Sequence, residues 1–488
     1  MTTHATTLFV LSATEGHAHR VSPNVTYLFA LILALMIAAL ALEEKIHAKK
    51  SLITGVFAVV CLFLGTALKL LPFEDSGPRA GDALIENVFG EVLELPVYIP
   101  AVDWGVIAII LGSSIFVDVV SKSGLFTWIA IKLTKASRGD PLFLLAYYCV
   151  MTVVFSALLN NVTAMLIVGS LTAVSLDRLG KSSMLLGFLL VEGLLTNIGG
   201  LLTLISSVPN IIVGNAAGIA FIEFFIIASP YVAVATAVTI LLGARRFGIK
   251  RLASDEERSE ANRMVQEFDE NDGIESRGFF WTCAALFVLF ILFLATASIL
   301  PVIKNLEMGY VALAFAVIIL IRYKSSVDQF YKAIDWDLLL FFAALFVVIN
   351  VMEHAQVLAL IGSVLKTYIL SLGEASSGAL LAASAIASAV TDNIPLAAMM
   401  AKIIGGLPEM AASVPTDQRP MELWWSVVFG ANLGGNITPI GSASTVVAVT
   451  VMHKHGLEMS FGRFVKLAVP FAALHIVLAV IYVMAFLR

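Results

Sequence analysis

Two short stretches, residues 156–165 (SALLNNVTAM) and residues 389–400 (AVTDNIPLAAMM), decide the fold of this chain. Each places two adjacent amide or carboxylate side chains between apolar runs. The two pairs are Asn160 with Asn161 and Asp392 with Asn393. Polar side chains are costly inside a membrane and usually mark a functional site there. Both stretches are therefore candidate parts of a binding site.

A second polar, glycine-containing stretch follows each of them, at residues 197–210 (NIGGLLTLISSVPN) and 432–445 (NLGGNITPIGSAST). Asn161 and Asn393 lie 232 positions apart, and Asn197 and Asn432, which open the two glycine-containing stretches, lie 235 apart. An Asp-Trp pair recurs with the spacing of 232, at residues 103–104 and 335–336. This nearly constant offset indicates that the chain consists of two copies of one unit.

The composition is that of a membrane protein with many spans. The chain has 488 residues, of which 59% are hydrophobic and only 13% charged, whereas soluble domains have about 25% charged residues. A spanning helix needs about 20 apolar residues, so roughly ten or more crossings fit. The apolar runs lack the alternation of a barrel strand. We therefore predict an all-α, multi-pass protein of the cell (inner) membrane that binds no nucleic acid.

The three cysteines, Cys61, Cys149 and Cys283, lie inside apolar runs and have neither metal-ligand nor disulfide spacing. They are expected to be ordinary core residues, and no cofactor is expected beyond a coupling ion. No Ser/His or paired-Asp arrangement suggests an intramembrane hydrolase. The chain is therefore not expected to be an enzyme.

Lysines and arginines set the predicted orientation. They gather around residues 45–50, 245–251 and 322–332, and placing all of these in the cytoplasm satisfies the positive-inside rule. The span that opens at Asp103 then runs inward and the span that opens at Asp335 runs outward. The two repeats are thus predicted to be inverted, as in many secondary transporters.

The repeats suggest a division of the chain into four parts. These are residues 1–102 (tail, two transmembrane helices and an outer loop), 103–244 (first repeat), 245–278 (cytoplasmic linker) and 279–488 (second repeat region).

Each repeat is expected to contain a re-entrant hairpin. The apolar arms around Asn160 and Asn161 are flanked by charges at 138–140 and at 177–181, which suit one face of the membrane. The segment would enter and leave on that face, with its amide pair at mid-depth. The predicted hairpins are residues 141–176 and 376–412.

Each repeat is also expected to contain a broken helix. Gly199, Gly200 and Pro209 interrupt the first run, since glycine costs about 1 kcal/mol and proline about 3 kcal/mol inside a helix. Free carbonyls at such a break can bind a cation and free amides an anion. Alternatively, the small and hydroxyl residues serve only helix packing. The predicted ion and substrate ligands are Asn160, Asn161, Thr163, Asn197, Gly199, Thr203, Ser206, Ser207, Asn210, Asp392, Asn393, Asn432, Gly434, Asn436, Thr438, Ser442, Ser444 and Thr445, with sodium at the Asn161 and Asn393 turns.

Three acidic residues fall inside apolar runs: Asp118, Glu192 and Asp392. A buried acid needs a partner, a proton or an ion, so all three are candidates for proton coupling. Asp118 could instead pair with Lys122, one helical turn away.

At these motifs the chain resembles the ion transporter superfamily that contains the arsenite permeases, the P-protein branch, the NhaD-type sodium/proton antiporters and the sodium/dicarboxylate symporters. The resemblance extends over residues 103–215 and 335–451. It implies two hairpins and two broken helices around a central site, a homodimer held by a scaffold, and elevator-type alternating access. The chain departs from the P-protein pattern at Asn160, where that branch usually has Asp, and at residues 206–210.

The predicted function is secondary active ion transport with sodium or proton coupling. Sodium/proton antiport and transport of an inorganic or other small anion are the leading forms. A sodium-coupled di- or tricarboxylate symporter and a passive ion channel on the same scaffold are the alternatives. Accumulation of substrate against a gradient separates a transporter from a channel.

Overall fold

The computed structural model describes residues 21–71, 96–159, 161–301, 303–323, 327–391, 393–410, 414 and 419–487. Within these ranges the chain is helical and contains no β-strand. The helices of the first half are α1 (Pro23–Ala41), α2 (Glu43–Ile46), α3 (Lys50–Ala67), α4 (Trp104–Lys122), α5 (Leu125–Ala136), α6 (Pro141–Leu158), α7 (Asn161–Arg178), α8 (Leu185–Gly199), α9 (Val208–Ala217) and α10 (Phe221–Arg246).

The helices that follow are α11 (Asp255–Gln266), α12 (Arg277–Thr296), α13 (Ile303–Leu320), α14 (Val327–Ala333), α15 (Trp336–His354), α16 (Val357–Leu372), α17 (Ser376–Val390), α18 (Asn393–Gly405), α19 (Met421–Gly434), α20 (Ala443–Lys454) and α21 (Phe461–Phe486). Short 3-10 turns are η2 (Ser182–Met184), η3 (Ile321–Tyr323), η4 (Gly373–Ala375) and η5 (Pro408–Met410).

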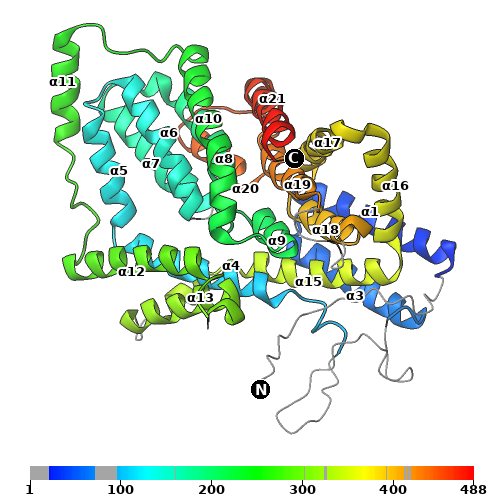
Figure 1. Cartoon of the computed structure of the whole chain (residues 1–488). Helices are drawn as coiled ribbons and strands as arrows, with labels where there is room; N and C mark the ends of the chain where they lie inside the picture. The colour runs from blue at the N-terminus through cyan, green and yellow to red at the C-terminus, as the bar shows by residue number, and fades with distance from the viewer. Residues whose placement is uncertain are drawn as a thin grey trace.

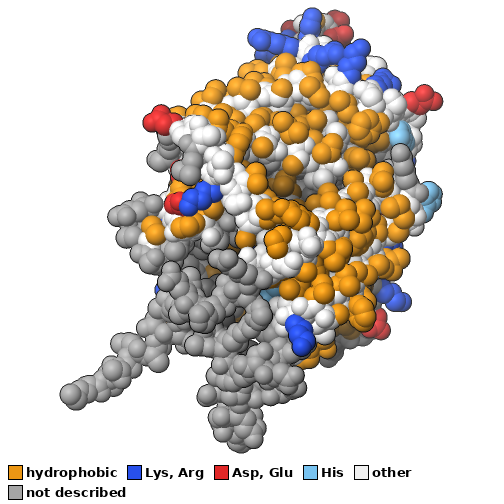
Figure 2. Space-filling view, turned by 90° about the vertical axis from the view of Figure 1, so that its right-hand side faces the viewer, with side chains coloured by type: hydrophobic (Ala, Val, Ile, Leu, Met, Phe, Trp, Pro, Cys, Tyr) orange, Lys and Arg blue, Asp and Glu red, His pale blue; other side chains and the backbone are white. Residues whose placement is uncertain are grey.

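Ten helical segments of the described chain are long and apolar enough to cross a membrane. Their outer surfaces are apolar as well, and Figure 2 shows hydrophobic side chains over much of one face with Lys and Arg gathered at its upper edge. The prediction of an all-α, multi-pass membrane protein is therefore confirmed. The three cysteines are buried free thiols, also as predicted.

The two Asp-Trp pairs start helices in the same way. The carboxylates of Asp103 and Asp335 cap α4 and α15, and each accepts a hydrogen bond of 3.0 Å from the backbone amide three residues later. The indoles of Trp104 and Trp336 each donate to the carbonyl five residues earlier. A side-chain cap satisfies one of the free amides of the first helical turn. The repeated sequence motif is thus also a repeated structural motif.

The helices pack in two groups (Figure 1). The framework group consists of α1, α3, α4 and α12 to α15, in which α4 packs on α13 and α3 on α15. The central group consists of α6 to α10 and α17 to α21, in which α6 packs on α8 and α17 on α19. Helices α5 and α16 contact both groups. The central group holds all four of the polar stretches that the sequence singles out.

The linker between the two halves packs against helices of the first half. Its helix α11 packs against α5, with Ala261 and Val265 buried. Glu270, just beyond the helix, forms ion pairs with Lys132 at 2.8 Å and Lys135 at 3.7 Å. The linker is therefore part of the folded protein rather than a loose tether.

Candidate functional site

Both expected helix breaks are present. Helix α8 ends at Gly199, and the chain becomes helical again at Val208, where α9 begins. Helix α19 ends at Gly434, and α20 begins at Ala443. Each break leaves carbonyls at one helix end and amides at the next start without partners in the helix. The prediction of broken helices at these positions is confirmed.

Asn197, in the last turn of α8, bonds to residues of the second break. Its Nδ2 donates to Asn436 Oδ1 at 2.8 Å and to Ser442 Oγ at 2.9 Å, and its Oδ1 accepts from Ser444 Oγ at 3.1 Å. The asparagine is buried, with an exposed fraction of 1%. All of these side-chain partners come from the other half of the chain.

Asn432, in the last turn of α19, bonds to residues of the first break. Its Oδ1 accepts from Ser207 Oγ at 2.7 Å, and its Nδ2 donates to Asn210 Oδ1 at 2.9 Å and to the Val428 carbonyl at 2.8 Å. The two breaks are thus joined reciprocally. We call the set Asn197, Ser207, Asn210, Asn432, Asn436, Ser442 and Ser444 the Asn197–Asn432 network.

Threonine hydroxyls anchor each break to a neighbouring helix. Thr203 Oγ1 donates to the Ala157 carbonyl of α6 at 2.6 Å, and Thr438 Oγ1 donates to the Ala389 carbonyl of α17 at 2.8 Å. The donors lie 235 positions apart and the acceptors 232 apart. The offsets seen in the sequence therefore recur in hydrogen bonds.

Two serines, one in each half, also donate equivalent hydrogen bonds to the helices that precede the breaks. Sequence reasoning missed both as site residues. Ser156 Oγ donates to the Thr196 carbonyl at 2.5 Å, and Ser388 Oγ donates to the Ala431 carbonyl at 2.6 Å. Both serines are fully buried. Their positions, 232 apart in otherwise apolar helices, are the sequence signal that could have found them.

Gly199 and Gly434 permit close helix packing beside the breaks. A Cβ on Gly199 would lie 2.6 Å from the Val153 carbonyl oxygen, and a Cβ on Gly434 would meet the Ala385 carbonyl oxygen in the same way. Both glycines are thus required by packing as well as by the helix ends. They bring α8 onto α6 and α19 onto α17.

The two turns expected to bind sodium are only partly described. Asn160 and Asp392 lie outside the described residues. Asn161 opens α7, and its Oδ1 accepts a hydrogen bond of 2.5 Å from the same serine of α6 that anchors α8. Asn393 opens α18 and is half-buried, as is Thr163 in the first turn of α7. Asn161 and Asn393 therefore hold equivalent positions, each as the first residue of its helix.

The remaining predicted ligands close the breaks internally. Ser206 Oγ donates to the carbonyls of Gly200 and Thr203, both at 2.7 Å. Asn210 Nδ2 donates to the same carbonyls, at 2.6 and 2.9 Å. In the second break, Thr445 Oγ1 likewise donates to two carbonyls. The site thus offers only uncharged donors and acceptors from its described side chains.

The two described acids lie in different surroundings. Glu192 of α8 is fully buried in the central group, and its Oε1 accepts from Thr172 Oγ1 of α7 at 2.7 Å, while its Oε2 has no hydrogen-bond partner among the described residues. Asp118 is in α4, outside the central group, and pairs with Lys122 at 3.2 Å. The alternative of an ion pair for Asp118 is therefore the one observed.

A cavity of about 750 Å³ lies between the two groups of helices. Its walls include Asn215 of α9, Lys402 of α18, Asn350 of α15, and Lys304 and Glu307 of α13. Sequence reasoning did not select any of these residues, because none stands in a repeated motif. The cavity separates one side of the central group from the framework group.

Residues 78–430 match the family model described as the citrate transporter family. The chain belongs to this family. Among curated relatives, an uncharacterized transporter of Mycobacterium tuberculosis is 31% identical over 392 residues, covering 78% of this chain and 86% of the relative. The human P protein is 26% identical over 534 residues, covering 92% of this chain and 61% of that protein. The resemblance to the ion transporter superfamily is thus confirmed, and both the family and the mycobacterial relative are described as transporters rather than enzymes.

Two solved structures support the fold of this citrate transporter family member. The Alcanivorax borkumensis YdaH transporter superposes with a TM-score of 0.55 at 15% identity, covering 95% of this chain and 98% of YdaH. Neisseria gonorrhoeae MtrF superposes with a TM-score of 0.53 at 14% identity, covering 96% of each chain. At this identity the likeness concerns the fold alone.

Proposed function

We propose that this protein is a secondary active transporter that moves a small anion through the Asn197–Asn432 network, with sodium ions or protons as the coupling species. The observation that carries the proposal is the reciprocal bonding of Asn197 and Asn432 across two broken helices. Packing alone does not require paired amides and hydroxyls in both halves. Such breaks at the midplane are the usual substrate sites of secondary transporters.

An anion suits the groups at the network. The N-termini of α9 and α20, with their free backbone amides, lie at the two breaks, where Ser207 and Ser442 hold the N-cap positions. Helix N-termini carry partial positive charge and bind anions without a lysine or arginine. A carboxylate is the substrate class that the description of the family favours.

Sodium ions would bind at the Asn161 and Asn393 turns. There the carbonyl ends of α6 and α17 and the amide oxygens of the turns supply the hard oxygen ligands that such cations prefer. Protons would bind Glu192, or Asp392 outside the described residues. Asp118 is the weakest candidate because Lys122 already balances its charge.

The transport cycle would follow from the two groups of helices. We infer that the repeats are inverted and that the central group moves as a body against the framework group, as in an elevator. The cavity between the groups and the few contacts across it support this motion. The framework group would also hold two copies of the chain together as a homodimer.

Sodium/proton antiport or transport of an inorganic anion is the second candidate. The observation that favours it is the lack of any charged side chain in the Asn197–Asn432 network. A di- or tricarboxylate often binds to a cationic clamp, whereas a small inorganic ion needs none. A passive channel would use the same site without coupling.

Transport by purified protein in proteoliposomes tests the proposal. Citrate, succinate, arsenite and sulfate are offered in turn with an inward sodium gradient, an inward proton gradient or neither. Accumulation of one anion above its equilibrium level, dependent on one gradient, is expected. Flux that only ever equilibrates the anion would identify a channel, and sodium/proton exchange without any anion would support the second candidate.

A further inference from the structure

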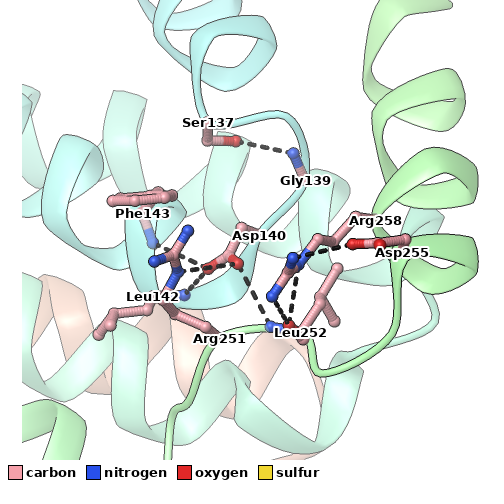
Figure 3. A network of polar contacts seen from close by, with 9 residues as sticks. All are labelled: Ser137, Gly139, Asp140, Leu142, Phe143, Arg251, Leu252, Asp255 and Arg258. Atoms are coloured by element: carbon pink, nitrogen blue, oxygen red, sulfur yellow. Dashed lines mark hydrogen bonds and ion pairs between the residues drawn. The ribbon is translucent and has the colours of Figure 1, made fainter.

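A second cavity, of about 580 Å³, lies where the turn between α5 and α6 meets the linker. Figure 3 shows the polar contacts between these two segments, including the hydrogen bond between Asp140 and Leu252. None of its lining residues belongs to either helix break. It is lined by Ala136, Ser137, Arg138, Asp140, Phe143, Tyr147, Arg251, Asp255, Arg258, Ser259 and Asn262.

The walls of this cavity are fixed by contacts between the turn and the linker. Gly139 has a φ of 71°, and a Cβ there would lie 2.7 Å from the Ala261 carbonyl oxygen of α11. Asp140 Oδ2 accepts from the Leu252 amide at 3.3 Å, and Arg258 donates to the Leu252 carbonyl at 2.8 and 3.0 Å. These contacts hold the turn and the linker together at the cavity.

Positive charge exceeds negative charge in the lining. Asp140 is 5% exposed, and its carboxylate already caps α6 and faces Arg251 at 3.8 Å. Asp255 is paired with Arg258 at 3.0 Å. The Arg138 side chain, by contrast, forms no hydrogen bond or ion pair within the described part of the chain. A guanidinium group matches a phosphate group in shape and charge. The unpaired guanidinium of Arg138, with the excess of positive charge around it, therefore suits a phosphate monoanion.

An apolar stripe of α6 runs from this cavity into the membrane. Phe143 and Tyr147, in the cavity wall, are 41% and 36% exposed, and Val150 and Val154 on the same face are 49% and 43% exposed. The Arg251 guanidinium lies over the Phe143 ring, 4.6 Å from its centre. The stripe begins at the level of the arginines and continues along a helix that is apolar enough to span a bilayer.

We propose that this cavity binds an anionic phospholipid, with its phosphate among Arg138, Arg251 and Arg258 and an acyl chain along the α6 stripe. Basic pockets at the surface of membrane proteins hold acidic headgroups in this way. Free phosphate shares the headgroup chemistry but does not use the stripe. The lipid would connect the linker to the hairpin of the first half, and it is independent of the transported substrate.

Native mass spectrometry of the purified full-length protein tests the proposal. The protein is incubated with dioleoyl phosphatidylglycerol or with dioleoyl phosphatidylcholine, and thermal stability is followed in parallel. Phosphatidylglycerol should be retained and should raise the melting temperature. Arg138→Gln should weaken its retention about fivefold, the effect of removing one arginine from a membrane surface, and adding Arg251→Gln should weaken it further.

Arg263→Gln is the matched control, because Arg263 is exposed on α11 and does not line the cavity. It should leave retention unchanged. Arg138 has no partner to lose, so Arg138→Gln should fold normally. Equal retention of both lipids, or unchanged retention by Arg138→Gln, would overturn the proposal. Stabilisation by inorganic phosphate equal to that by phosphatidylglycerol would overturn the assignment to lipid.

Discussion

Asn197 and Asn432 hold equivalent places in the two repeats but have different partners. Asn197 bonds to two serines and an asparagine, whereas Asn432 bonds to a serine, an asparagine and a backbone carbonyl. The position equivalent to Asn210 is Thr445, which bonds within its own break. The network is therefore related by the repeat but is not symmetric, so its two ends offer a substrate different groups.

Replacing either asparagine by alanine should disable transport. Asn197→Ala and Asn432→Ala each leave buried partners without a hydrogen bond, at a cost of about 1–3 kcal/mol per group. We expect transport in proteoliposomes to fall at least about tenfold, which corresponds to about 1.4 kcal/mol. Asn305→Ala, at an exposed position in α13, is the control. Unchanged transport by both network variants would remove the network from the mechanism.

Gly199→Ala and Gly434→Ala should destabilise the fold. The added methyl group would collide with a carbonyl oxygen of the neighbouring helix, and overpacking of this kind costs about 1–3 kcal/mol. A lower melting temperature in detergent is the expected result. Gly55→Ala in α3, where a Cβ meets nothing within 4 Å, should be neutral or slightly stabilising. Equal behaviour of all three variants would contradict the close packing at the breaks.

At the scale of elements, the helix breaks could be predicted because glycine and proline act locally. The repeat was also visible, because Asn161, Asn393 and the Asp-Trp pairs keep a fixed spacing. The partners of Asn197 could not be predicted, since they lie up to 247 positions away and depend on how the halves pack. Ser156 and Ser388 were missed because a hydroxyl in an apolar helix resembles a packing residue. The docked linker was equally hidden, since its polar surface is typical of a loop.

The packing of the linker helix α11 against α5 should weaken at low pH. The hydrogen bond from Lys132, together with the charges of Lys132 and Lys135, lowers the pKa of Glu270 below its ordinary value. A lowered pKa in the folded state means that the stabilisation is present above the unfolded value and is lost as the pH falls through the folded value. We therefore expect hydrogen exchange in α11, corrected for the intrinsic rate, to quicken below about pH 4.3.

Glu270→Gln provides the comparison for this prediction. It keeps the shape of the side chain but has no charge to lose, so its exchange should already be fast at neutral pH and should change less on acidification. Asp269, whose pKa is also lowered, chiefly by the Asn271 amide, remains in both proteins. Identical exchange by the two proteins across the whole range would rule out a role for Glu270.

For the whole molecule, the boundary between the framework and central groups is the place to test motion. Lys402 of α18 and Glu353 of α15 form an ion pair of 3.1 Å across it. A reducible bis-methanethiosulfonate cross-linker, long enough to replace the two long side chains, should stop transport when it joins Glu353→Cys to Lys402→Cys if the central group moves as a body, and reduction should restore it. The native cysteines are buried and should not interfere.

A second cysteine pair separates motion from damage. Ser51→Cys and Asp337→Cys join α3 to α15, two framework helices whose native side chains are hydrogen-bonded. This cross-link should leave transport intact, because no movement between these helices is expected. Transport that continues with the Glu353–Lys402 positions fully cross-linked would be incompatible with an elevator.

The reciprocal asparagine bonds also constrain how the protein is made. The Asn197 amide must wait for Ser442, which is 245 positions further along the chain, and translation at about 5–20 residues per second takes roughly 12–49 seconds to reach it. During that interval the newly inserted first half would hold uncompensated amides at bilayer depth. We therefore expect biogenesis to depend on an insertase that shelters nascent α8, or on delayed release of α8 into lipid.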